Sequence, residues 1–392
     1  MKKKKKNNKI ELHEPLALQH RPKELSDLIG QEAAVSQIFG MFKKKRMSRS
    51  FLITGPLGSG KTSIARLIAK YANCENFNHK EVRPCNECYS CKTFTSSGIK
   101  GNHDIHEING GEERGINDVR NIKKNSRYLP RGNFRIYIID ECHKLTKDAQ
   151  GAFLKPLEEP PKHTIFIMVT TDPEMLLPTI RSRCKPLQIK HLREKEICKL
   201  LRRVSKKEGC LDSLNKDIFK KIAMQTDNHP RDALQVLDNV MDVIGSGEEI
   251  KDINVEKLAQ TVTGAPPWQI VGKFLFSIYQ GSYAGALKSA LDIENADYFM
   301  KSVLKYHNYA LYSSLLPGKY YNKSFYYFDK EFKSLVAKEK IIINNKFKMA
   351  MANTMEEFVS TASDIKSYLV EGNHLVSSCI AKVVPDFKYA KK

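Results

Sequence analysis

The feature that most constrains the fold of this chain is the loop at 55–62, which reads Gly-Pro-Leu-Gly-Ser-Gly-Lys-Thr. An apolar run precedes it at 51–53, and a helical pattern follows at 63–69. Glycines in a strand-to-helix loop let several N–H groups point at one anion, and the helix N-terminus adds its positive end. The pattern predicts a phosphate-binding loop (P-loop) in an α/β domain, although a glycine-rich turn with an incidental lysine is the alternative. The predicted nucleotide contacts are Gly55, Pro56, Leu57, Gly58, Ser59, Gly60, Lys61, Thr62 and Ser63.

Two further segments predict what happens to the bound nucleotide. Residues 134–141 read as a buried parallel strand that ends in Asp140 and Glu141. In a P-loop site Lys61 reaches the β- and γ-phosphates, and the Thr62 hydroxyl binds Mg²⁺ together with Asp140. Glu141 is then placed as the general base that polarises a water molecule, which favours hydrolysis over binding alone. The next strand, at 164–171, brings more polar side chains to the same edge of the sheet.

Four cysteines form a cluster with the spacing of a metal site. Cys74, Cys85, Cys88 and Cys91 follow the pattern Cys-x10-Cys-x2-Cys-x2-Cys. Four thiolates form the closed tetrahedral shell of a structural Zn²⁺ site. The alternatives are disulfides, which the Lys-rich start without an apolar signal core disfavours, and an iron–sulfur cluster, which fits the same spacing.

The order and spacing of several motifs resemble those of bacterial clamp-loader ATPases, in particular the gamma/tau subunits of DNA polymerase III in the AAA+ superfamily. The resemblance runs from about residue 15 to about residue 240 and includes the cysteine cluster, which is characteristic of the family. The motifs that carry it are Arg21-Pro22, Asp27-Leu28-Ile29-Gly30-Gln31-Glu32, the P-loop, Asp140-Glu141-Cys142-His143, Leu157-Glu158-Glu159-Pro160-Pro161, Thr170-Thr171-Asp172-Pro173, Ser182-Arg183-Cys184 and Arg231-Asp232-Ala233-Leu234.

The resemblance assigns roles to residues outside the P-loop. It implies that the segment from Arg21 to Gly30 runs over the adenine. Thr171 matches the first sensor, near the γ-phosphate, with Thr170 as the second choice, and Arg231 matches the second sensor. Arg183 matches the arginine finger, which acts on the nucleotide of a neighbouring subunit, so that hydrolysis would require assembly.

The charge of the chain favours a polyanionic partner. Lys and Arg total 65 against 44 Asp and Glu, a net charge of +21. Such a field attracts DNA phosphates, and the resemblance implies that Lys144, Lys147 and Lys155 face the DNA-binding channel of a ring. The N-terminal Lys2–Lys6 with Lys9 reads as a solvated tail; a DNA-tethering arm and a nuclear-import signal are the alternatives.

The expected architecture has four parts. Residues 1–12 form a basic tail; 13–190 an AAA+ nucleotide-binding α/β domain with the zinc module at 74–91; 191–247 a helical lid; and 248–392 an all-helical collar for oligomerisation. The stretch 245–249 is a candidate hinge. The aromatic residues at 320–328 favour core packing, with base stacking as the alternative. Pro156, a departure from the family pattern, is expected to kink or end its helix near residue 155.

The function that the resemblance implies is that of an ATP-hydrolysing motor subunit of a DNA sliding-clamp loader, with ATP, Mg²⁺ and Zn²⁺ as cofactors. The expected partners are the sliding clamp, primer-template DNA and other loader subunits in a hetero- or homo-oligomeric ring, with a pentamer as the expected assembly. No apolar stretch reaches the ~20 residues that cross a bilayer, so we expect a soluble, cytoplasmic protein of the replisome without a membrane partner. The alternatives are a non-hydrolysing stator subunit, which often has a damaged P-loop, and a Holliday-junction or replication-restart motor, against which the cysteine cluster argues.

Overall fold

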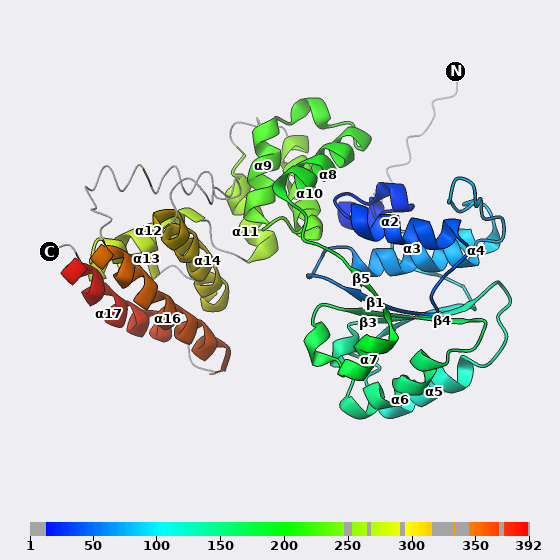
Figure 1. Cartoon of the computed structure of the whole chain (residues 1–392). Helices are drawn as coiled ribbons and strands as arrows, with labels where there is room; N and C mark the ends of the chain where they lie inside the picture. Colours follow the sequence, from blue (N-terminus) through cyan, green and yellow to red (C-terminus); the bar gives the residue numbers. More distant parts are fainter. Residues whose placement is uncertain are drawn as a thin grey trace, which may run out of the picture. The chain divides into compact units, whose positions relative to one another are not determined.

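The computed structural model describes residues 13–246, 253–264, 268–290, 295–315, 333, 345–367 and 372–390 (Figure 1). The chain packs into two compact units. The first unit comprises Met1–Leu214 and Asn228–Asp238, and the second unit comprises Asn215–Asp227 and Asn239–Lys392. The predicted domain boundaries at 190 and 247 stay predictions.

A five-stranded parallel sheet forms the centre of the first unit. Its strands are β1 (Ser50–Thr54), β2 (Ile105–Asn109), β3 (Arg135–Asp140), β4 (Thr164–Thr170) and β5 (Lys185–Gln188), in the order β2-β3-β4-β1-β5. Thr54 pairs with Thr170, and Asn109 pairs with Asp140. The carboxyl ends of β1, β3 and β4 therefore lie along one edge, where the P-loop and the Asp140-Glu141 pair emerge. The predicted α/β class is confirmed.

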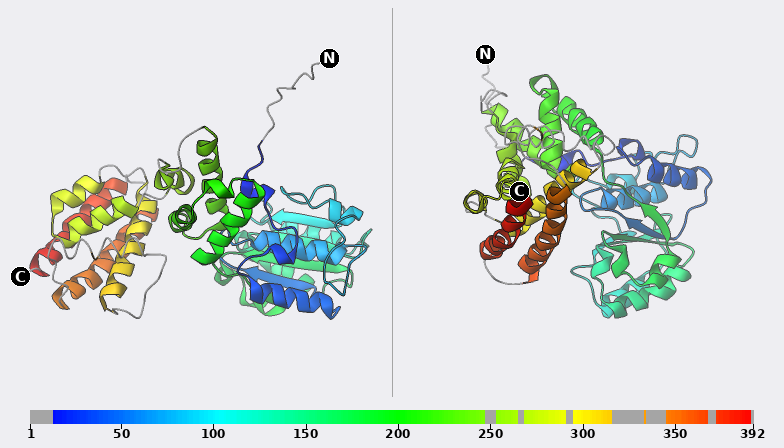
Figure 2. Two further views of the ribbon diagram at one scale, coloured as in Figure 1. Left: turned by 90° about the horizontal axis from the view of Figure 1, so that it is seen from above. Right: turned by 60° about the vertical axis from the view of Figure 1, so that its left-hand side comes forward.

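Helices cover both faces of this sheet (Figures 1 and 2). On one face lie α2 (Glu32–Lys43) and α3 (Lys61–Asn73), and on the other α5 (Ile116–Asn125), α6 (Lys147–Glu158) and α7 (Pro178–Arg183). Successive strand residues point to opposite faces, so Ile138 packs in the core on the side of α3, whereas Tyr137 and Ile139 pack in the core on the side of α6. Burial on both faces explains why the central strands read as continuous apolar runs.

Shorter elements and two longer helices complete the first unit. The short ones are α1 (Leu16–Gln19), η1 (Leu25–Asp27), α4 (Tyr89–Lys92), η2 (Cys142–Lys144), η3 (Pro173–Met175) and η4 (Leu211–Ser213). The longer ones are α8 (Glu194–Lys207), which lies wholly in this unit, and α10 (Pro230–Gly245), of which residues 230–238 belong to it. These helices fall in the part predicted to be a lid.

The second unit is helical in every element that the structure describes. It contains α9 (Lys216–Gln225), α11 (Val255–Thr263), α12 (Trp268–Tyr279), α13 (Tyr283–Ala290), α14 (Ala296–Leu315), α16 (Asn345–Ser367) and α17 (Gly372–Ala390). Aromatic side chains from α12, α14, α16 and α17 form much of its core, among them Phe274, Tyr279, Phe299, Phe358 and Phe387. Its role as an oligomerisation collar stays a prediction.

One local prediction is answered in part. Pro156 does not end its helix near residue 155, because α6 continues through it to Glu158, and a kink at this proline stays a prediction. A proline this close to the C-terminus of a helix removes a single N–H bond, and its buried ring adds to the packing under α6.

Other predictions fall on residues outside the described ranges. These are the Lys2–Lys6 and Lys9 tail, the aromatic residues at 320–328 and residues 247–249 of the candidate hinge. Within the described residues, no helix is both long and apolar enough to span a bilayer.

Candidate nucleotide-binding site

A cavity of about 360 Å³ opens at the carboxyl edge of the sheet, and all of its lining belongs to the first unit. It brings together four regions that are distant in the sequence: the N-terminal segment, the P-loop, the end of β3 and the helices α8 and α10. The lining residues that the sequence predicted are Arg21, Leu57, Gly58, Ser59, Gly60, Lys61, Thr62, Ser63, Asp140, Glu141 and Arg231. The predicted Gly55 and Pro56 begin the same loop but do not line the cavity.

The P-loop has the conformation that its glycines allow. Gly58 and Gly60 have φ values of 69° and 92°, in the left-handed region that favours glycine. Gly55 lies so close to β5 that a Cβ atom there would approach the carbonyl oxygen of Ile189 to 2.5 Å. Glycine is therefore favoured at 58 and 60 by the left-handed backbone and at 55 by the lack of space for a Cβ atom, and α3 begins directly after the loop at Lys61.

Lys61 is nearly buried at the N-terminus of α3, with 5% of its surface exposed. Its Nζ donates to the carbonyl oxygen of Pro56 at 2.8 Å. Burial lowers the pKa of Lys61, and the nearby charges of Glu141, Asp140 and Asp172 partly oppose this. A phosphate anion would supply the missing counter-charge.

Thr62 and Asp140 form the contact expected of a magnesium site. The Thr62 hydroxyl donates to Oδ2 of Asp140 at 2.6 Å, which joins the start of α3 to the end of β3. A hydroxyl and a carboxylate are the hard oxygen ligands that Mg²⁺ prefers. The residues present therefore fit the ion.

Glu141, the predicted general base, has a left-handed backbone with a φ of 51°. This conformation is uncommon for a residue with a side chain, and its occurrence at the end of β3 is consistent with a functional role for Glu141. The Glu141 N–H donates to Oδ1 of Asp140 at 2.9 Å. Gly110 follows β2 and packs against this turn, where a Cβ atom would lie 2.8 Å from the Glu141 carbonyl oxygen.

His143 contacts Glu141, a feature for which the sequence reasoning assigned no role. Its Nε2 lies 3.4 Å from Oε2 of Glu141, and its Nδ1 lies 2.9 Å from the hydroxyl oxygen of Thr170. Thr170 is fully buried, whereas Thr171 is half-buried and donates to Oδ2 of Asp172 at 2.6 Å. The only sequence signal for His143 was its place in the Asp140-Glu141-Cys142-His143 motif.

The three predicted arginines have different surroundings. Arg21 and Arg231 line the cavity, and Nη1 of Arg21 is buried without a hydrogen-bond partner. Arg183 lies at the end of α7 outside the cavity, where its Nε donates to Oε2 of Glu158 at 3.0 Å and its Nη1 to the carbonyl oxygen of Thr179 at 3.0 Å. A finger residue that acts on a neighbour is expected to lie outside its own chain's site.

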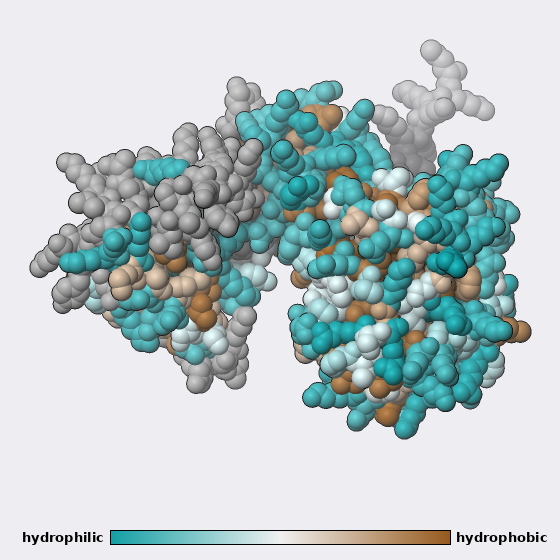
Figure 3. All heavy atoms as spheres, viewed as in Figure 1, coloured by the Kyte–Doolittle hydropathy of each residue, from teal (hydrophilic) through white to brown (hydrophobic). Residues whose placement is uncertain are grey.

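The three lysines predicted to contact DNA are exposed. Lys147 and Lys155 lie on α6, eight residues apart, whereas Lys144 lies on η2 with its Nζ 3.9 Å from Oε2 of Glu141. On the face of the first unit drawn in Figure 3, most of the surface is hydrophilic.

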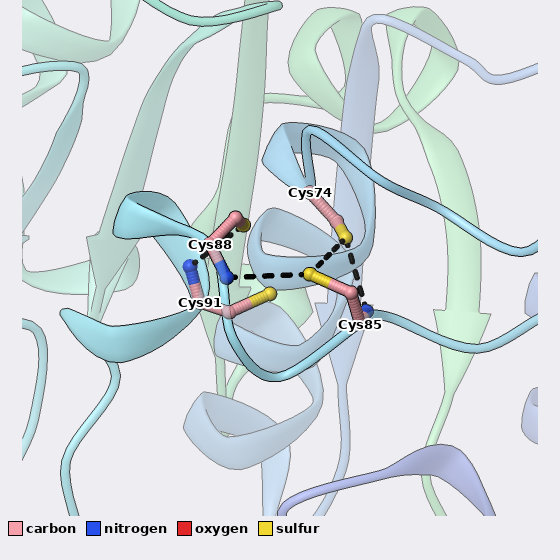
Figure 4. Close-up of side chains that lie close together, drawn as sticks. All are labelled: Cys74, Cys85, Cys88 and Cys91. Carbon is pink, nitrogen blue, oxygen red and sulfur yellow. Dashed lines mark hydrogen bonds between the residues drawn. The ribbon is translucent and has the colours of Figure 1, made fainter.

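The four clustered cysteines converge at the C-terminal end of α3 (Figure 4). Their sulfur atoms all lie within 4.8 Å of one another, and those of Cys74 and Cys85 are 3.5 Å apart. Backbone N–H groups of Cys85, Cys88 and Cys91 each donate to the sulfur of a preceding cysteine of the cluster, at 3.2 to 3.4 Å. These distances fit four sulfurs around one tetrahedral ion.

The electrostatics of the cluster also fit a cation. The backbone N–H of Glu87 does most to lower the pKa of Cys85, to about 6. Burial raises the pKa values of Cys74 and Cys91. Four adjacent thiolates require a positive ion to offset their charge, and Zn²⁺ supplies it when bound.

Comparisons with known proteins agree with this geometry. The family model described as DNA polymerase III, delta subunit, matches residues 30–193, a range that contains the P-loop, Asp140, Glu141, the four clustered cysteines and Arg183. DNA polymerase III subunit tau of Bacillus subtilis is 33% identical over 270 residues, which cover 69% of this chain and 46% of that protein. Subunit gamma of Buchnera aphidicola subsp. Acyrthosiphon pisum is 34% identical over 241 residues, which cover 61% of this chain and 64% of that protein.

The chain is a gamma/tau-type protein. It spans about half the length of the Bacillus tau subunit and less than two thirds of the Buchnera gamma subunit. Among solved structures, the Thermotoga maritima RuvB Holliday junction branch migration motor is 21% identical, with 67% of this chain and 80% of that chain covered and a TM-score of 0.45. At that score the likeness supports no functional argument.

Proposed function

We propose that this gamma/tau-type chain is an ATP-hydrolysing subunit of a loader that places sliding clamps on primer-template DNA in the cytoplasm. The observation that carries the proposal is the 2.6 Å contact between Thr62 and Asp140, with Glu141 lining the same cavity as the P-loop. A subunit that does not hydrolyse ATP would not need a general base at Glu141. The joint presence of these groups favours turnover over binding alone.

The residues of the cavity, with Thr171 outside its lining, divide the reaction among them. The P-loop N–H groups and Lys61 hold the phosphates, while Thr62 and Asp140 hold Mg²⁺, which when bound neutralises charge on the β- and γ-phosphate oxygens. Glu141 accepts a proton from the attacking water. Arg21 lies on the adenine side, Thr171 senses the γ-phosphate, and Arg231 joins the helical lid to the nucleotide.

Arg183 supports a requirement for assembly. Its partner Glu158 is more than half exposed, and a surface ion pair of this kind is worth only about 0–1 kcal/mol. Exchange of Glu158 for a neighbour's γ-phosphate is therefore inexpensive, and it would link hydrolysis to a ring of loader subunits, for which we propose five. In that ring Lys144, Lys147 and Lys155 contact DNA phosphates, and Zn²⁺ in the four-cysteine cluster stabilises the fold.

The test is the ATPase rate of the full chain alone, with primer-template DNA, and with DNA, a sliding clamp and the other loader subunits of the same source. We expect DNA and clamp together to stimulate turnover. Absence of hydrolysis in the complete mixture would favour the stator. Stimulation by four-way junctions without an effect of the clamp would favour a recombination motor.

Two variants test the residue assignments in the same assay. Lys61→Ala is expected to abolish nucleotide binding, because the buried ammonium is the charge that faces the phosphates. Glu141→Gln should retain binding and lose turnover by about 10²- to 10⁴-fold, the usual contribution of a general base. Glu113→Gln, an exposed carboxylate outside the cavity, is the matched control. Wild-type turnover in Glu141→Gln would refute the general-base assignment.

A further inference from the structure

We propose that His143 and Thr170 are positioning residues for Glu141: a hydrogen bond from the Thr170 hydroxyl orients the imidazole of His143, and the imidazole contacts one carboxylate oxygen of Glu141. The proposal rests on the hydrolytic function proposed above and adds two residues to it. Neither side chain lines the cavity. Their effect would therefore pass through Glu141.

The direction of the hydrogen bond between Thr170 and His143 follows from the surroundings of the Thr170 hydroxyl. The Thr170 hydroxyl oxygen accepts the backbone N–H of Asp172 at 3.0 Å and lies 2.9 Å from Nδ1 of His143. Thr170 is fully buried, so no water competes for its hydroxyl hydrogen. The oxygen could accept a second N–H, but the hydroxyl hydrogen has Nδ1 of His143 as its acceptor among the described hydrogen bonds of Thr170, so it donates there and Nδ1 is unprotonated.

A neutral imidazole that accepts at Nδ1 carries its hydrogen on Nε2. That nitrogen lies 3.4 Å from Oε2 of Glu141 and 3.8 Å from Oδ2 of Asp172, so the nearer acceptor is Glu141. The His143 side chain is only 9% exposed, which limits its freedom to turn away. The structure thus assigns the Nε2–H tautomer to His143.

His143 therefore restrains one of the two carboxylate oxygens of Glu141. His143 and Lys144 both lie near Oε2, at 3.4 and 3.9 Å. Oε1 is then the oxygen that faces a water molecule and takes its proton. A catalytic group displaced by about 1 Å can lose about 10²-fold in rate, so loss of this hold should lower turnover without an effect on nucleotide affinity.

The kinetic test compares Thr170→Val with Thr170→Ser in the assembled loader with DNA and clamp. Valine has the shape of threonine without its hydroxyl, whereas serine keeps the hydroxyl and loses only a methyl group. We expect kcat to fall about 10- to 100-fold in Thr170→Val, with an unchanged Kd for ATP, and to recover in Thr170→Ser. If Thr170 served only for packing, kcat would fall more in Thr170→Ser than in Thr170→Val, because serine leaves the larger cavity. Equal kcat in the two variants, or a loss of ATP binding that accounts for the whole effect, would overturn the proposal.

A spectroscopic test on the full chain does not depend on turnover. In ¹⁵N-histidine-labelled protein, the signal that disappears in His143→Asn belongs to His143, and its shifts report the tautomer. We expect Nε2–H in the wild type and in Thr170→Ser, and a loss of this preference in Thr170→Val. An Nδ1–H tautomer in the wild type would overturn the proposed positioning of Glu141 by His143 and Thr170, even if the chain hydrolyses ATP. Absence of hydrolysis in the wild type would instead refute the proposed function, and the tautomer would still decide whether His143 and Thr170 are arranged as proposed.

Discussion

Each of the two units buries a histidine in a polar network, and the two networks end in different places. In the first unit His143 connects buried Thr170 to Glu141, which lines a cavity. In the second unit His307 is fully buried, with Nδ1 2.7 Å from the Tyr279 hydroxyl and Nε2 2.7 Å from the carbonyl oxygen of Met351. A carbonyl can only accept, so His307 donates from Nε2 and accepts from Tyr279 at Nδ1.

The two networks differ in the groups that the histidine contacts, and these groups determine whether the network serves packing or the site. The described hydrogen bonds of His307 join groups in the core, where a buried polar group must be satisfied and contributes to one specific packing. The His143 network ends on a carboxylate that can act on a ligand. Burial lowers the pKa of His307 to about 4 and raises the pKa of Tyr279 well above its ordinary value, so both side chains stay neutral near neutral pH.

The largest expected effect is that of metal removal, which should destabilise the first unit and leave the second unchanged. Cys88→Ser should release Zn²⁺ and destabilise the first unit by several kcal/mol, since structural zinc contributes on the order of 10 kcal/mol to small zinc domains. Hydrogen exchange should therefore become faster in the first unit and stay unchanged in the second. Metal analysis completes the measurement.

Cys210→Ser, at a half-buried cysteine of the first unit outside the cluster, controls for the loss of a thiol. Freshly purified protein without zinc would contradict the assignment. Iron in place of zinc would establish the alternative that the cysteine spacing leaves open.

The second prediction concerns acid and the second unit. Below pH 6.5 the unfolded chain protonates His307, whereas the folded unit does not until about pH 4. Stability therefore falls as pH falls, by about 2 kcal/mol between pH 6.5 and 5 for this shift in pKa. Hydrogen exchange of the second-unit amides during urea unfolding, at each pH, measures it. In His307→Leu the dependence should flatten over this range, and an equally steep dependence in that variant would show that other groups cause it.

The sequence was sufficient for those parts of the first unit that depend on local spacing. The apolar runs predicted β1, β3 and β4 to within a residue or two, and the P-loop and the Asp140-Glu141 pair followed directly from them. The four cysteines lie within eighteen residues, so their spacing alone indicated that they could meet. In each case the distance in space is set by a short stretch of backbone.

Contacts between distant elements could not be predicted in the same way. His143 meets Thr170 because β3 and β4 are neighbours in the sheet, and nothing in either segment specifies which hydroxyl will face the imidazole. The left-handed backbone at Glu141 depends likewise on the space that Gly110 leaves beside it. The second unit has no short motif at all, because its core depends on apolar side chains that many arrangements of helices could bury.

The third prediction tests whether the geometry at Glu141 depends on Gly110, the glycine that follows β2. In Gly110→Ala the new Cβ would lie 2.8 Å from the Glu141 carbonyl oxygen and 3.1 Å from that of Asp140, and backbone atoms cannot yield cheaply. We expect a loss of about 1–3 kcal/mol in stability and of about tenfold or more in turnover. Gly151→Ala in α6, where a Cβ would meet nothing within 4 Å, should instead stabilise by about 0.5–1 kcal/mol. Equal effects of the two variants would contradict the proposed fit.

The smallest expected effect concerns which unit contacts DNA. Lys147→Gln with Lys155→Gln should lower the slope of log K against log salt by about 1 for each DNA phosphate that no longer pairs with a lysine, without a change in sequence preference. Lys144 is left intact because it also lies near Glu141. The matched control is Lys257→Gln with Lys288→Gln, two exposed lysines of the second unit. An equal change of slope in the control would contradict this assignment, because the second unit would then share the DNA-binding role that we assign to α6.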